Sequence, residues 1–78
     1  MIIPIDELAS IIGADVSEGQ HLPEVDWWVY KLTGTKADAV YGDVGKGNCE
    51  VISIIPKVEP IETVLKAVLT ASEVEGGS

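Results

Sequence analysis

The segment Glu24–Leu32 constrains the fold of this chain more than any other, because it holds both tryptophans of the protein. Valines and a tyrosine accompany them, and such a run of β-branched and aromatic residues is typical of a β-strand. In a strand, successive side chains point to opposite faces. Trp27 and Trp28 are therefore expected to lie in two different environments, one of which is the core.

This segment also predicts a binding surface. If Trp27 faces the core, the alternate residues form an apolar patch on the other face of the strand, beside two acidic side chains. Apolar patches mark interaction sites, and aromatic residues dominate the energetics of interfaces. We therefore predict that a partner binds at Trp28, Tyr30, Leu32, Asp26 and Glu24. The sequence leaves open which indole faces the core, and whether both tryptophans serve only the fold.

Three strands are predicted in the middle of the chain, at residues 25–33, 37–41 and 49–55. Residues 33–36 suit a tight turn between the first two strands, and the glycine-rich residues 42–48 suit a longer loop before the third. Short connections of this kind favour antiparallel pairing. The segment therefore predicts a three-stranded antiparallel β-meander.

A helix is predicted on each side of these strands. Pro4–Ile12 begins with proline and acidic residues, which suit a first turn, and Gly13 is a typical stop. Residues 59–72 show a stripe with helical spacing, which we expect to pack on the sheet. The stripe consists of Ile61, Val64, Leu65, Val68 and Leu69. The predicted fold class is α+β: helix, three-stranded antiparallel β-meander, and C-terminal amphipathic helix packed on the sheet.

The length of 78 residues suits one domain. We expect a single α+β domain over residues 1–75. Residues 76–78 are expected to form a flexible tail, which an expression vector could have contributed.

The charge of the chain restricts its partners. Thirteen acidic residues stand against five lysines and no arginine, which gives a formal net charge of −8. Proteins that bind nucleic acids directly neutralise phosphates with clustered basic residues, so direct binding to DNA or RNA is not expected. A basic protein is the natural complement. No long apolar run or positively charged leader is present, so we expect a cytoplasmic protein that does not bind membranes.

Three candidate chemistries fail on residue type or spacing. The loop Gly42–Asn48 has glycines and a lysine, but not in the order of a phosphate-binding loop. Cys49 and His21 are the only thiol and imidazole, and a free cysteine in a strand is usually a small buried apolar residue. One cysteine and one histidine do not make a structural zinc site. No catalytic, cofactor-binding or metal-ligating residue is predicted.

The sequence therefore favours a small, acidic, non-enzymatic interaction module that binds a protein partner or its own copy through an aromatic sheet face or a strand edge. That partner is expected to be basic or nucleic-acid-binding. Two alternatives stay open. One is an acidic phage- or plasmid-type inhibitor that mimics the charge of nucleic acid, as anti-restriction and anti-CRISPR proteins do. The other is a repeated structural subunit of a viral or cellular assembly.

Overall fold

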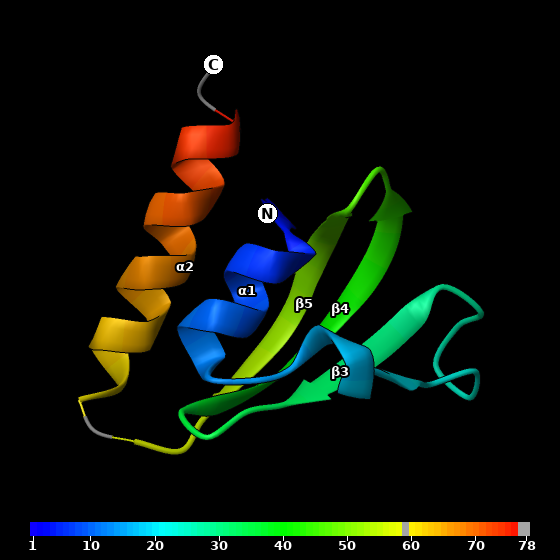
Figure 1. Cartoon of the computed structure of the whole chain (residues 1–78), viewed down its shortest axis with the longest axis horizontal. Helices are drawn as coiled ribbons and strands as arrows, with labels where there is room; N and C mark the ends of the chain where they lie inside the picture. Colours follow the sequence, from blue (N-terminus) through cyan, green and yellow to red (C-terminus); the bar gives the residue numbers. More distant parts are fainter. Residues whose placement is uncertain (59, 77–78) are drawn as a thin grey trace.

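The computed structural model describes residues 1–58 and 60–76. In chain order, the elements are β1 (Ile2–Pro4), α1 (Ile5–Ile12), the short 3-10 helix η1 (Val16–Glu18), β2 (Gln20–His21), β3 (Val29–Thr33), β4 (Ala37–Gly45), β5 (Asn48–Pro56) and α2 (Ile61–Gly76). The strands form one antiparallel sheet in the order β1-β5-β4-β3-β2. Both helices pack with this sheet (Figure 1).

The α+β class is confirmed, and the three predicted strands are the centre of a five-stranded sheet. The two short edge strands β1 and β2 were not predicted. The expected loop at residues 42–48 is wrong, because most of it belongs to β4 and β5. A two-residue turn joins them, and its residues Lys46 and Gly47 have φ values of 59° and 76°. Positive φ at both positions suits the twist of a tight hairpin.

The first helix follows its prediction closely. Pro4 precedes α1, Asp6 and Glu7 occupy its first turn, and Gly13 ends it with φ of 72°. A left-handed residue at this position is the common end of a helix, and glycine adopts it without strain. Leu8, Ala9 and Ile12 of α1 are buried.

A single core cluster lies between both helices and one face of the sheet. We call this the core face. Residues opposite one another in neighbouring strands point to the same face, so the register identifies its members. Leu32 lies opposite Ala39, which lies opposite Ile54, and Tyr30 lies opposite Tyr41. Leu32 and Ala39 are fully buried, and Tyr30 packs against the cluster.

The C-terminal helix is less buried than predicted. Of its five-residue stripe, only Val64 and Val68 are buried, whereas Ile61, Leu65 and Leu69 are exposed. The reason is its position, since α2 packs beside α1 and against β1 rather than across the middle of the sheet (Figure 1). The helix also continues to Gly76, beyond the predicted end at residue 72. The predicted helix start at Glu59 and the tail residues 77–78 lie outside the described residues.

We call the opposite side of the sheet the outer face. Its residues do not belong to the core cluster, which the helices share with the other face. The register places three rows of residues there. The first row is Ile2, Glu50, Gly42 and Val29, the second is Ser53, Val40, Lys31 and Gln20, and the third is Ile55, Asp38 and Thr33. Val29 is buried yet does not belong to the core cluster, as expected for a residue that points away from the helices.

Candidate protein-interaction surface

The segment that carries both tryptophans is a turn for half its length. The predicted strand 25–33 is correct only from Val29 onward, and turns occupy most of the residues before it. The carbonyl of Leu22 accepts from the backbone N–H groups of Val25, at 3.1 Å, and Asp26, at 3.3 Å. These local bonds close the chain on itself, which a strand does not do. We call residues 22–28 the 22–28 loop.

The two indoles do lie in different environments, but the reason is the geometry of a turn and not the alternation of a strand. Trp27 is 77% exposed, so the arrangement with Trp27 against the core is wrong. Trp28 is half-buried and its ring covers Gly42, where a Cβ atom would fall on the ring itself. Glycine at position 42 therefore permits this contact, and Trp28 lies on the outer face of the sheet.

Two of the five predicted binding residues belong to the other face. Leu32 has no exposed surface, and Tyr30 stacks on Tyr41 with 5.9 Å between ring centroids. The expected patch of Trp28, Tyr30 and Leu32 on one face is therefore not formed. The alternation breaks at the start of β3, where the turn reorients Trp28. Sequence reasoning missed this because the run of apolar residues continues unchanged across the boundary.

The two acidic residues of the prediction, Glu24 and Asp26, are both exposed in the 22–28 loop. The Asp26 carboxylate accepts from the backbone N–H of Trp27 at 2.8 Å. The loop therefore holds an acidic group at the base of an exposed indole. Whether a partner binds these residues stays a prediction.

The outer face offers apolar surface that the predicted site did not include. Ile55 is 54% exposed and Ile2 is 49% exposed. Val40 of β4 is half-buried and lies opposite Lys31 of β3. Trp28 extends this surface over Gly42. In a monomer these aliphatic groups remain in contact with water, which is unfavourable by about 25 cal/mol for each Å² of apolar surface.

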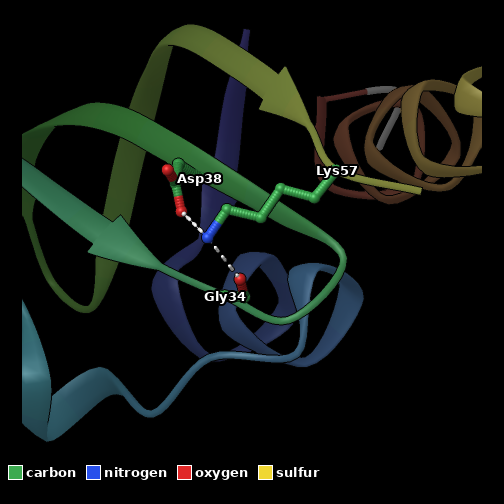
Figure 2. A network of polar contacts seen from close by, with 3 residues as sticks. All are labelled: Gly34, Asp38 and Lys57. Atoms are coloured by element: carbon green, nitrogen blue, oxygen red, sulfur yellow. Dashed lines mark hydrogen bonds and ion pairs between the residues drawn. The ribbon is translucent and has the colours of Figure 1, made fainter.

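The charges of the outer face are balanced. Lys31, Asp38 and Glu50 occupy its rows, and Lys57 reaches Asp38 with its ammonium nitrogen 2.8 Å from the carboxylate. Figure 2 shows that the same ammonium also donates to the carbonyl of Gly34, at 3.1 Å. The hydrogen bond from Lys57 holds the pKa of Asp38 below its usual value. The Asp38 carboxylate therefore stays charged at neutral pH, and among the described residues the face carries two positive and two negative groups.

The surroundings of the Cys49 thiol and the His21 imidazole indicate that both side chains serve the fold. Cys49 is fully buried in the core cluster, and burial raises its pKa to about 11, so the thiol stays protonated at neutral pH. A protonated, buried thiol is a poor nucleophile. The His21 ring lies against the Tyr30 ring in a tilted arrangement, with 4.8 Å between ring centroids, and its Nε2–H donates to the carbonyl of Trp27.

Among residues 1–58 and 60–76, no cluster of three or more potential metal ligands occurs. Nor does any helix within that part of the chain have the length and apolar character needed to cross a membrane.

The chain matches no protein-family model, no curated protein and no solved structure.

Proposed function

We propose that this protein is a non-enzymatic interaction module that associates with a second copy of itself through the outer face of its sheet. The observation that supports the proposal most is the distribution of charge. Among the described residues, the outer face contains two positive and two negative groups, so these four groups add nothing to the formal net charge of −8 of the chain. Two copies that approach through their outer faces bring neutral surfaces together and keep their acidic surfaces apart.

The apolar groups of this face add the driving force. Ile2, Ile55, Val40 and Trp28 would all lose water in a symmetric contact, and a C2 interface uses the same patch on both copies. Aromatic side chains that are partly exposed before association contribute strongly to such interfaces. The proposal therefore includes Trp28 in the interface, with a different set of neighbours from the one that the sequence predicted.

The test is the mass of the protein in solution, measured by light scattering over a range of concentrations. We expect a dimer for the natural sequence and a monomer for Ile55→Lys, which places an unpaired charge in the contact. Leu65→Lys is the matched control, because Leu65 is an exposed aliphatic residue of α2 outside the outer face. It should leave the dimer intact. A monomer at every concentration up to the millimolar range would refute the proposal.

Salt separates this proposal from the charge-mimic alternative. Each copy carries a charge of −8, so added salt should screen their mutual repulsion and strengthen the dimer. A charge mimic would instead lose its basic partner as salt rises. A mass that keeps growing with concentration would favour the repeated structural subunit.

A further inference from the structure

The 22–28 loop presents a tryptophan to solvent in a way that the outer-face dimer does not explain. Trp27 is the most exposed large apolar side chain among the described residues, at 77%, and Val25 beside it is 61% exposed. Tryptophan is on average well buried in folded proteins. Side chains this exposed bury little apolar surface and so add little to the stability of the fold.

The exposure does not come from a loose loop, because hydrogen bonds fix its backbone at both ends. Leu22 N–H donates to the carbonyl of Val29 at 2.8 Å, and Val29 N–H donates to the carbonyl of Asp26 at 3.2 Å. The carbonyl of Trp28 accepts from Asp43 N–H of β4 at 3.0 Å.

Both backbone polar groups of Trp27 are hydrogen-bonded. Its N–H donates to the Asp26 carboxylate, and its carbonyl accepts from the His21 ring. An anchor residue whose backbone is already ordered loses little conformational entropy when a partner binds. The loop is therefore pre-organised to insert the indole into a pocket.

The charge around the indole selects the partner. Residues 15–30 contain four acidic residues and no lysine, and the two within the loop, Glu24 and Asp26, are exposed. Phosphates of nucleic acids and anionic lipid headgroups are repelled by such a surface, whereas lysine and arginine are attracted. A guanidinium or ammonium group also binds favourably to the face of an indole.

We propose that the 22–28 loop is a docking site for a basic protein segment, in which Trp27 fills an apolar pocket and Glu24 and Asp26 pair with flanking lysine or arginine side chains. The proposal rests on Trp27, Glu24 and Asp26, none of which is assigned to the dimer contact, so it does not depend on the outer-face dimer. Trp28, which packs on Gly42, positions the loop and does not enter the pocket.

The experiment uses a random-peptide display library as the probe, selected against the full chain and depleted on Trp27→Ala. We expect the enriched peptides to be positively charged and to carry apolar residues between the charges. Binding of the best synthetic peptide is then measured by fluorescence anisotropy. Trp27→Ala should weaken it by about tenfold or more, the loss typical of an anchor residue.

Matched variants test each part of the proposal. Glu24→Gln should weaken binding of the peptide and flatten its salt dependence, because one ion pair is removed. Leu69→Ala, an exposed aliphatic residue of α2, should leave binding unchanged, and Ile55→Lys should also leave it unchanged although it abolishes the dimer. Circular dichroism checks that each variant is folded.

Three results would overturn the proposal. The first is the enrichment of acidic or neutral peptides, and the second is equal affinity of the best peptide for the natural chain and for Trp27→Ala. The third is a blue shift of tryptophan emission when vesicles of phosphatidylcholine and phosphatidylserine are added, if Trp27→Ala removes that shift. The last result would assign the loop to a membrane surface instead.

Discussion

The two faces of the sheet use the same strands for opposite purposes. Along β4, Ala37 and Ala39 point to the core face and are fully buried, whereas Asp38 and Val40 point to the outer face and remain partly accessible. Small side chains on the core face let α1 approach the sheet closely. Helices therefore cover one side of the sheet, whereas apolar groups of the other side, such as Ile2 and Ile55, stay exposed.

The largest expected effect is on the core face. Ile12→Ala truncates a fully buried side chain of α1 and leaves a cavity in the core. We expect the free energy of unfolding to fall by about 2–5 kcal/mol, the usual range for such a change. Urea denaturation measures it. A loss no greater than that of an outer-face substitution would break the distinction between the two faces.

Burial of the thiol gives a second test of the core face. The folded state raises the pKa of Cys49 from 9.0 to about 11, so folding favours the neutral thiol. The corresponding stabilisation is complete below pH 9 and is lost as the pH rises through about 11. Between these values the natural chain should therefore lose more stability than Cys49→Ala, by about 1.4 kcal/mol for each unit of pKa shift. The difference between the two proteins removes the contributions of the groups that both share. Parallel pH profiles would show that the thiol is not buried.

A third prediction concerns the one close contact on the outer face. In Gly42→Ala, the new methyl group would overlap the ring of Trp28, so the indole must move. We expect a destabilisation of about 1–3 kcal/mol, typical of overpacking, and a red shift of tryptophan emission. In a Trp28→Ala background the same change should cost much less, because its obstacle is gone. Equal costs in both backgrounds would mean that the indole does not lie on Gly42.

The smallest effect is expected at Ile55, the counterpart of Ile12 on the outer face. At a concentration where the chain is monomeric, Ile55→Ala should change the free energy of unfolding by no more than about 0.5 kcal/mol, because half of the side chain is already exposed. At dimer concentrations the cost should rise. A large cost in the monomer would show that the chain itself covers this position.

The sequence predicted what depends on local chemistry. The proline before α1, the acidic residues in its first turn, the glycine after it and the presence of three central strands were readable from residue type, although not all bounds of these strands were. β1 and β2 were not, because strands of three and two residues carry no periodicity and exist only through distant pairing. Which residues of the apolar stripe of α2 stay exposed depends on how α2 packs against α1 and β1. The helical spacing of the stripe does not reveal how much of it these elements cover.

The candidate site was predicted only in part, for a related reason. Glu24, Asp26 and Trp28 are on the surface as expected, whereas Leu32 lies in the core. β-propensity favoured a strand through both tryptophans, but bonds to the Leu22 carbonyl form a turn instead. The signal that Trp28 packs on Gly42 is a glycine inside a strand, which often marks a close approach by another group.

The way α1 ends has a consequence for the order of folding. The carbonyls of Ile12 and Gly13 accept from the backbone N–H groups of Lys36 and Thr35, at 2.9 and 3.1 Å, and both donors lie in the connection between β3 and β4. A helix of eight residues is marginal in isolation. The carbonyls at the end of α1 find these two hydrogen-bond donors only when the β3–β4 hairpin has formed, so the hairpin stabilises the helix. We therefore expect the transition state of folding to contain the hairpin and the last turn of the helix together, with neither formed alone.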